Sequence, residues 1–434
     1  MDSVEWLEGE IGERGSFAFD AVNADWFDSI DTELGPVRAG TLDPVVSIAE
    51  IVLASGQSIL IDEIIRNAAN KDEAGERRWI EILFDQGDLI VSHFPNLFGP
   101  PAVRKADIKP VPEKAVAALE QLVSLDEIDS ATQKNLEAAL AIQPGLAVSV
   151  YDVGQGNCNA VLNAAYQPLL YYDFGGGVMW HAGTVPPGLI GLCVCNHPPV
   201  ILSHWDWDHW ANALRAVTHA ASGDPLALPW IAPRQKIGAV HRAFIAKLSN
   251  LLLWPDQGLT KLDVGPISVH KCDSTRSNRN HSGLVMEFRP GWAKGNGVLF
   301  PGDCDYDFLP DQVRQKQNYD VICVPHHGGK SPSANVFAPV AAASYKRLCY
   351  SAGDPNNYRH PRQETINAHR AKKWTPRDER YTFTGRKSGK QKFGHILLDP
   401  VWMVRSRSIP SPCACEVPYY QYRHNHRHWF TYAI

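Results

Sequence analysis

The chain has 434 residues, of which 44% are apolar, and a net charge of only −5, as expected for a globular protein of two or three domains. No apolar run reaches the ~18 residues that cross a bilayer, and residues 1–5 contain neither a basic region nor a signal-like apolar core. The nine cysteines are scattered and odd in number, which favours a reducing cytoplasm over a disulfide framework. We therefore expect a cytoplasmic protein with no membrane partner.

The N-terminal part is acidic and its apolar spacing suits helices. Residues 1–100 carry 20 acidic and 6 basic side chains, a net charge of −14. The spacing predicts helices over 43–54, 59–70 and 76–84, the first capped by Asp43 with Pro44 in its first turn, and a helical pair over 113–123 and 129–141. We expect residues 1–140 to form an α-rich accessory domain, whose charge makes it a candidate surface for a protein partner.

From residue 145 onward, short apolar strands alternate with turns, and one helix is expected over 236–253. Several strands end in Asp, Asn or His beside Gly or Pro; these segments are 148–157, 169–177, 298–303, 321–329 and 348–361. Strands fix the loops that follow them, so ligands at strand ends are a common way to build a site.

The densest of these patterns is Ser-His-Trp-Asp-Trp-Asp-His at residues 203–209, directly after the apolar run 199–202. Packing gives no reason to alternate His and Asp at the end of an apolar strand. Imidazole nitrogens and carboxylate oxygens are the ligands of divalent ions such as Zn²⁺ or Mn²⁺. The segment therefore predicts a metal site; the alternative is a polar loop flanked by tryptophans.

The order and residue types of these motifs resemble the metallo-β-lactamase fold, and within it the soluble hydrolase domain of ComEC-type competence proteins. The resemblance covers about residues 145 to 400 and depends on five motifs, at 152–157, 203–209, 302–303, 325–329 and 359–361. It implies an α/β fold, the metallo-β-lactamase αββα sandwich, over residues 145–410. Residues 411–434 would be an aromatic and basic tail packed on or extending this hydrolase domain.

The resemblance also implies the site residues. Its metal ligands would be His204, Asp206, Asp208, His209, Asp303, His327 and His360, and its catalytic residues Asp208, His326 and His327. Asp303 corresponds to a carboxylate that bridges two metals, and His326 or His327 to the next histidine of the pattern. Asp206 stands where the wider superfamily has His. The additional oxygen ligand shifts the expected ions, one or two per chain, from Zn²⁺ toward Mn²⁺ or Mg²⁺.

The chain departs from the pattern at several positions. Asn157 replaces an Asp, Gly329 replaces a Ser, Arg359 replaces a Gly, and residues 210–213 replace a Gly pair. His281 lies where the superfamily has a further ligand, but a surface histidine is an equal expectation. The departures concern the first metal position; the second, built from Asp208, His209, Asp303 and His360, is complete in sequence.

Charge points to a polyanionic substrate. Residues 341–410 carry 15 basic and 5 acidic side chains, a net charge of +10, which suits phosphate binding; the alternative is a solvated basic face. The tail over 419–430 interleaves aromatic and basic residues, which suits single-stranded nucleic acid or an edge strand. We expect a divalent-metal-dependent phosphodiesterase, a nuclease cleaving DNA or RNA with metal-activated water. The alternatives are a hydrolase of a small ester, lactone or thioester, and a non-catalytic binding or regulatory subunit.

Overall fold

A computed structural model describes residues 78–111, 113–143, 145–185, 192–216, 223–272, 278–329, 335–341, 343, 345–382 and 395–399, and the backbone of the short strands 2–4, 16–22, 46–52, 421–422 and 431–432. The chain divides into two compact units. The smaller unit comprises residues 1–129 and 236–247, and the larger one comprises residues 130–235 and 248–434.

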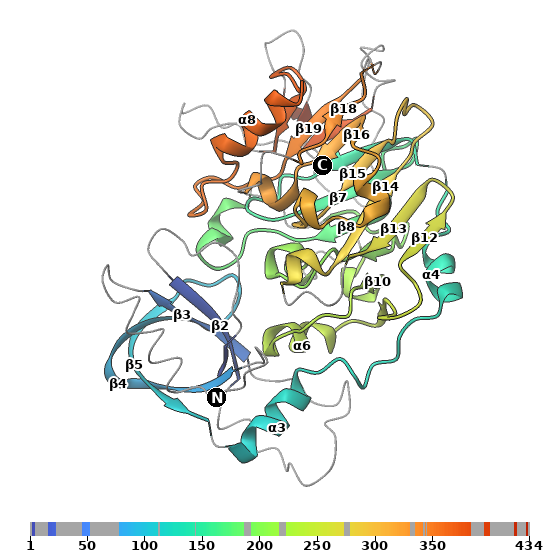
Figure 1. The fold of residues 1–434 in the computed structure, drawn as a ribbon. Helices are drawn as coiled ribbons and strands as arrows, with labels where there is room; N and C mark the ends of the chain where they lie inside the picture. Colours follow the sequence, from blue (N-terminus) through green and yellow to red (C-terminus); the bar gives the residue numbers. More distant parts are fainter. Residues whose placement is uncertain are drawn as a thin grey trace. The chain divides into compact units, whose positions relative to one another are not determined.

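The smaller unit contains a five-stranded antiparallel sheet, whose curved blue strands are visible in Figure 1. Its strands, in sheet order, are β1 (Asp2–Val4), β2 (Ser16–Val22), β3 (Val46–Val52), β4 (Arg78–Phe94) and β5 (Ala102–Pro110). Strand β1 also pairs with β4, so the first four strands close into a ring. The pairing of β4 with β5 is irregular between Phe84 and Leu89, where Asp85 and Gly87 have positive φ.

The expected helices over 43–54 and 76–84 are wrong, because these residues form β3 and β4; residues 59–70 lie outside the described residues. Val46, Ile48, Ile51 and Val52 are β-branched, and β3 lies between two partner strands, so sheet pairing overrides an apolar spacing that also suits a helix. The described part of residues 1–110 is therefore β-rich, not α-rich.

The predicted helix over 113–123 is confirmed as α3 (Glu113–Leu122). Leu119 and Leu122 share an apolar cluster with Ala239 of α6 (Ala239–Ile245), so α6 belongs to the smaller unit although the sequence on either side belongs to the larger one. The helix expected over 236–253 is accordingly too long, since residues 250–253 form a strand.

The larger unit contains two seven-stranded sheets within the described residues. The first, in sheet order, is β11 (Asn250–Leu253), β10 (Pro229–Ala232), β9 (Val200–Ile201), β8 (Pro168–Phe174), β7 (Cys158–Leu162), β6 (Ala147–Val150) and β21 (Ile396–Leu398). The second is β12 (Lys261–Val264), β13 (Ile267–Lys271), β14 (Leu284–Phe288), β15 (Val298–Phe300), β17 (Val321–Cys323), β19 (Arg347–Tyr350) and β20 (Glu379–Tyr381).

Smaller elements complete the described chain. They are the strand pairs β16 (Asn318–Tyr319) with β18 (Ala338–Pro339) and β22 (Gln421–Tyr422) with β23 (Thr431–Tyr432), the α-helices α4 (Gln133–Leu140), α5 (Asn212–Ala216), α7 (Asp311–Arg314) and α8 (Gln363–Ala371), and the 3-10 helices η2 (Met179–Thr184), η3 (Trp207–His209), η4 (Pro225–Ala227), η5 (Arg279–His281), η6 (Tyr306–Phe308) and η7 (Pro325–Gly328). Helix α4 falls within the predicted 129–141.

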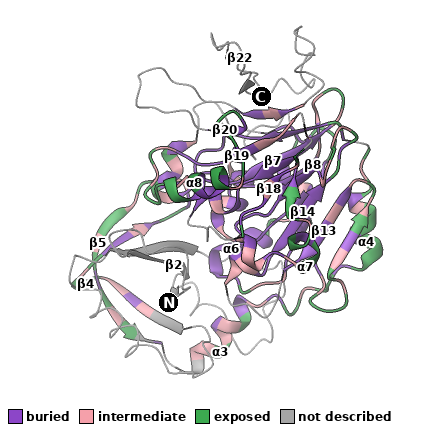
Figure 2. Cartoon of the chain, turned by 45° about the horizontal axis from the view of Figure 1, so that its top comes forward, coloured by how far each residue is buried: buried purple, intermediate pink, exposed green. Residues whose placement is uncertain are grey.

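The two sheets pack face to face, since one apolar cluster contains residues of both, among them Val148 and Val298. Along β15 the side chains alternate: Val298 and Phe300 join this inner cluster, whereas Leu299 joins a second cluster with Val313 of α7 and Ile366 of α8. The central strands of both sheets are thus buried on both faces, as their purple colour in Figure 2 shows. The larger unit is a mixed α/β sandwich.

No described helix has the length and apolar character that crossing a bilayer requires. Of the tail over 411–434, the structure describes only the backbone of β22 and β23, which pair antiparallel. The roles predicted for the tail's side chains lie outside the described residues.

Candidate metal centre

The candidate ligands gather where neighbouring strands of both sheets end. Strand β8 runs parallel to β9 in the first sheet, and β15, β17 and β19 run parallel to one another in the second. Carboxyl ends of parallel strands meet at one edge of a sheet, which is where open α/β sheets bind ligands. Residues 203–209 follow β9, Asp303 follows β15, and His326 and His327 follow β17.

Five predicted ligands form two overlapping groups. His204, His209 and Asp303 make one group, and Asp208, His209 and His327 make the other; within each group the ligand atoms lie within 4.8 Å of one another. His209 Nε2 is 3.2 Å from Asp303 Oδ1, and His327 Nε2 is 3.2 Å from Asp208 Oδ2. Ligand atoms around a tetrahedral ion with bonds of ~2 Å are ~3.3 Å apart, so this spacing suits a divalent ion.

Hydrogen bonds fix the tautomers of the three histidines. The Nδ1 of His327 lies 2.8 Å from the carbonyl oxygen of Ser351, which can only accept, so Nδ1 carries the proton. His209 Nδ1 likewise donates to Asp173 Oδ2 at 2.8 Å. The Ser203 hydroxyl donates to Asp173 at 2.9 Å, which leaves its oxygen to accept from His204 Nδ1 at 2.9 Å. In their neutral forms, all three imidazoles therefore keep a lone pair on Nε2.

Within the described residues, no hydrogen-bond donor satisfies these lone pairs. The Nε2 atoms of His204, His209 and His327 and the Oδ1 of Asp303 are buried and have no hydrogen-bond partner among the described residues. Buried polar atoms without partners are rare and costly. Here four of them converge, and they belong to ligand types that divalent metals prefer. The donor set therefore fits a divalent metal ion.

Asp173 is a functional residue to which the sequence analysis gave no role. It lies near the end of β8 with a positive φ of 60°, fully buried, and besides His209 and the Ser203 hydroxyl it accepts the Ser203 N–H at 2.6 Å and the Asn157 Nδ2 at 2.8 Å. Its only sequence signal was an acidic residue before three glycines. The departure at Asn157 now has a reason, since an amide can donate to Asp173 where a second carboxylate would repel it.

Backbone hydrogen bonds hold the loop that carries Asp208. The carbonyl oxygen of Asp208 accepts the N–H groups of Asn157 at 3.0 Å and Gly176 at 3.1 Å. A Cβ added at Gly175 would lie 1.7 Å from the same oxygen, so residue 175 must be glycine for the backbones to approach this closely.

His326 and His327 occupy a strained turn. Their φ values are 49° and 53°, in the left-handed region, and Gly328 follows with 85°. Such a conformation costs on the order of 1 kcal/mol or more for each non-glycine residue and is found mainly at functional sites. The rings of the two histidines point in different directions. His327 is buried among the candidate ligands, whereas His326 is partly exposed with its Nε2 3.8 Å from Asp303 Oδ2.

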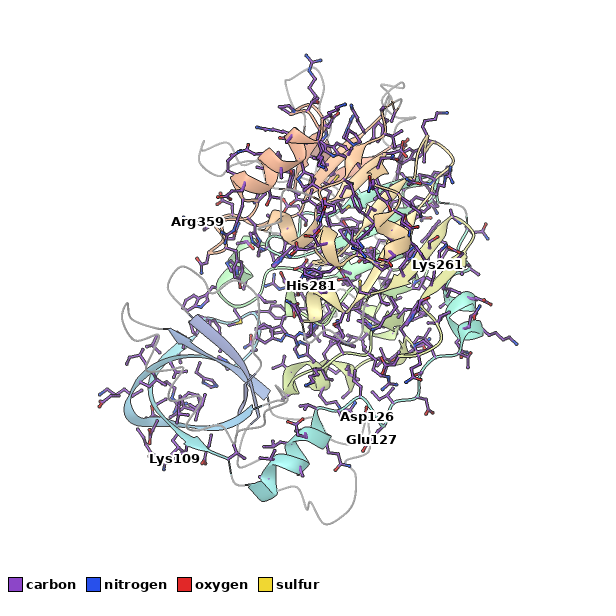
Figure 3. All side chains as sticks on the ribbon, in the orientation of Figure 1. Lys109, Asp126, Glu127, Lys261, His281 and Arg359 are labelled. Carbon is purple, nitrogen blue, oxygen red and sulfur yellow. The ribbon has the colours of Figure 1, made fainter. Side chains whose placement is uncertain are left out.

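Asp206 and His281 lie beside the centre but outside both ligand groups. Asp206 Oδ2 is 3.2 Å from His204 Nε2, while Asp206 Oδ1 is 2.9 Å from the Nη2 of Arg279. His281, labelled in Figure 3, has its Nε2 3.6 Å from Asp305 Oδ2 and its ring 4.0 Å from that of Phe308.

His360 also lies outside both groups. Its ring centroid is 5.3 Å from that of His326 and 6.2 Å from that of His327, and Asn356 holds its backbone with two hydrogen bonds. The structure thus gathers Asp208, His209 and Asp303 with His327, and it leaves His360 further out.

Charges around the centre shift the ionisation of its members. Burial raises the pKa of Asp303, but His209, His327 and His326 outweigh it and hold the pKa well below the usual range. Burial alone would lower the pKa of His209, but Asp303, Asp173 and Asp208 raise it well above the usual value, and Asp303 and Asp208 raise that of His327. The centre therefore attracts positive charge, and a metal ion would displace protons from it.

No family model matches the chain, and no curated protein matches it. One solved structure that matches is the metallo-β-lactamase fold protein YhfI from Bacillus subtilis, with 15% identity and a TM-score of 0.29, over 51% of this chain and 93% of that one. At this TM-score the likeness supports no conclusion about the chain, so fold and site rest on the topology and contacts described above.

Proposed function

We propose that this chain is a divalent-metal-dependent hydrolase of the metallo-β-lactamase fold that cleaves phosphodiesters, with DNA or RNA as its substrate. The observation that carries the proposal is the convergence of three buried imidazole Nε2 atoms on Asp303, each imidazole oriented through its Nδ1. The face-to-face sheets with ligands at their strand ends support the fold assignment.

His204, Asp208, His209, Asp303 and His327 would hold the ion, which activates water near neutral pH and offsets negative charge on the substrate. Asp173 and the Ser351 carbonyl keep the imidazoles of His209 and His327 in the ligating tautomer. His326, partly exposed with its Nε2 3.8 Å from Asp303 Oδ2, would give a proton from its ring to the leaving oxygen.

Exposed aromatic rings favour a nucleic acid over a small ester. Tyr358 and Trp180 are two of the large apolar side chains that stay exposed, at 37% and 47%. The Tyr358 ring stacks on His360 at 5.5 Å and lies 5.0 Å from the ring of His181, which follows Trp180. Arg359, which follows Tyr358 in the chain and is labelled in Figure 3, is also exposed. Aromatic faces mixed with cations suit bases and phosphates of a single strand.

The test is cleavage of labelled single- and double-stranded DNA and RNA with added Mn²⁺, Zn²⁺ or Mg²⁺. An aryl ester, a lactone and a thioester are assayed in parallel, and Asp303→Ala gives the background. We expect cleavage of nucleic acid by the unaltered chain alone. Cleavage of only the esters would contradict the phosphodiesterase assignment. No cleavage of anything by folded, metal-loaded protein would contradict hydrolase function and favour a binding subunit.

A further inference from the structure

The carboxylate of Asp206 is divided between the metal centre and a cation of the protein. One oxygen lies 3.2 Å from His204 Nε2, and the other lies 2.9 Å from the guanidinium of Arg279. Both side chains are largely enclosed, with 22% of Asp206 and 10% of Arg279 exposed. The Asp206 carboxylate is therefore already paired with a cation that the protein itself supplies.

The side chain of Gln235 holds the backbone of Arg279 in place. The side-chain amide of Gln235 donates to the Arg279 carbonyl at 2.7 Å and to Ser282 Oγ at 2.8 Å, while its oxygen accepts the N–H of Trp205 at 3.2 Å. Trp205 lies between His204 and Asp206 in the chain. Gln235 thus links the loop that carries Asp206 to helix η5, which carries Arg279. The ion pair is therefore held by the protein around it and is not formed by two mobile surface side chains.

The remaining candidates for a second ion do not complete a second site. His281 is directed to Asp305 and Phe308. The two ligand groups share His209, whose Nδ1 is used by Asp173, so its single remaining nitrogen can bind only one ion at a time. Among the described residues, the two groups therefore outline one centre, with His204 and Asp206 at its Arg279 side.

We propose that the centre holds a single metal ion and that Arg279, paired with Asp206, supplies the second positive charge beside it. A guanidinium is always charged and presents several N–H donors in a plane, so it suits both a carboxylate and a phosphate oxygen. A fixed cation at this place opposes the binding of another ion. This inference rests on the proposed metal-dependent hydrolase, since it concerns the number of ions in the same site.

The experiment counts the ions. The full chain is loaded with Mn²⁺ or Co²⁺, freed of unbound metal, and measured by elemental analysis; the end point of a Co²⁺ absorbance titration gives a second count. We expect one ion per chain for the unaltered protein and for Arg279→Lys, which keeps the charge. For Arg279→Gln we expect two, because His204, Asp206 and Asp303 then offer three ligands without a competing cation. Arg314→Gln, which removes an exposed arginine paired with Asp311, is the matched control and should bind one.

Two ions in the unaltered protein would overturn the inference, and this measurement needs no variant to fold. One ion in folded Arg279→Gln would overturn it as well, with circular dichroism as the folding control. No ion in the unaltered protein at saturating metal would contradict the proposed function itself. The stoichiometry thus separates failure of the inference from failure of the function.

Discussion

In the described part of the larger unit, two buried groups of histidine and carboxylate side chains differ in the partners that balance their charges. The first is the metal centre. The second, here called the Glu287 cluster, consists of Glu287 with His270, Lys316 and Tyr319. Glu287 accepts hydrogen bonds from His270 at 2.8 Å, from Lys316 at 2.6 and 2.8 Å, and from Tyr319 at 2.7 Å. Burial raises its pKa, but these three donors outweigh it and lower the pKa to about 2.

Residue type alone therefore does not define a metal site. Both oxygens of Glu287 are bonded to donors that the protein itself provides, so the carboxylate needs no further partner, although His270 Nδ1 has none among the described residues. In the metal centre the Nδ1 atoms are bonded and the Nε2 atoms are not. The Glu287 cluster contributes to stability, whereas the metal centre would be complete only when a cation is added from outside.

Loss of Asp303 should produce the largest effect on activity. Asp303→Ala removes the carboxylate that faces His204, His209 and His327. We expect turnover to fall at least ~10³-fold and the bound ion to be lost, because the charge that holds it is gone. The melting temperature should change little, since residue 303 follows the end of a strand. Assays of turnover and metal content check this, and near-normal values of both would show that the centre is assigned wrongly.

Loss of Glu287 should lower stability and leave the metal content unchanged, the opposite of what we expect for Asp303. Glu287→Ala leaves His270 and Lys316 without their carboxylate, and breaking a buried ion pair costs about 3–5 kcal/mol. We expect the free energy of unfolding in urea to drop by that order while the number of bound ions stays unchanged. Asp263→Ala, which breaks the half-exposed pair with Lys261, is the control and should cost no more than about 1 kcal/mol. A Glu287 variant that loses its metal would remove the distinction between the two groups.

A buried histidine outside both groups predicts a pH dependence of stability. His369 donates from Nδ1 to the Thr365 carbonyl and accepts the Tyr306 hydroxyl at Nε2, and burial lowers its pKa to about 4. The unfolded chain, with a pKa near 6.5, binds the proton more readily between pH 6.5 and 4. Stability from this residue is thus full above pH 6.5 and falls by up to about 3 kcal/mol as the pH drops to 4.

Urea unfolding at several pH values measures this slope. His369→Gln should reduce the slope, whereas His197→Gln, at an exposed position, should leave it unchanged. An unchanged slope in the His369 variant would mean that the folded state accepts the proton there.

A smaller effect is expected at Asp173, which orients a ligand without touching the ion. Asp173→Asn offers an NH₂ group or a weaker acceptor to His209 Nδ1, so the ring loses its fixed tautomer. Changes of this kind typically lower metal affinity by about 10–100-fold. Competition with a chelator measures it. The Ser203 hydroxyl also lies 3.1 Å from His209 Nδ1, so an affinity equal to that of the unaltered chain would show that Ser203 alone is enough to orient His209.

The smallest effect is expected at His281. The sequence left its role open, but the structure turns it toward Asp305 and Phe308. His281→Ala should keep the bound ion and retain turnover within about threefold, as is usual for residues away from the reacting groups. Loss of the ion in this variant would show that His281 is a metal ligand after all.

The sequence predicted candidate ligands in compact motifs at strand ends, and His204, Asp208, His209, Asp303 and His327 do converge, whereas Asp206 and His360 lie outside the two groups. It could not predict the partners. Asp173 meets His209, and Arg279 meets Asp206, only because distant strands bring their loops together. In residues 46–52 the local pattern suited helix and strand alike, and pairing with β2 and β4 decided between them.

The backbone contacts at Asp208 form without a metal ion, so we expect metal exchange to proceed without unfolding. Its carbonyl oxygen accepts the N–H groups of Asn157 and Gly176, and the missing side chain of Gly175 lets the two loop backbones approach, all without any ion. An ion would therefore bind where the surrounding backbone is already fixed, and little conformational entropy would be lost. In such a site, the identity of the bound metal follows the supply in the surroundings and the ease with which each ion sheds its water. One metal can then replace another during the lifetime of a single folded molecule.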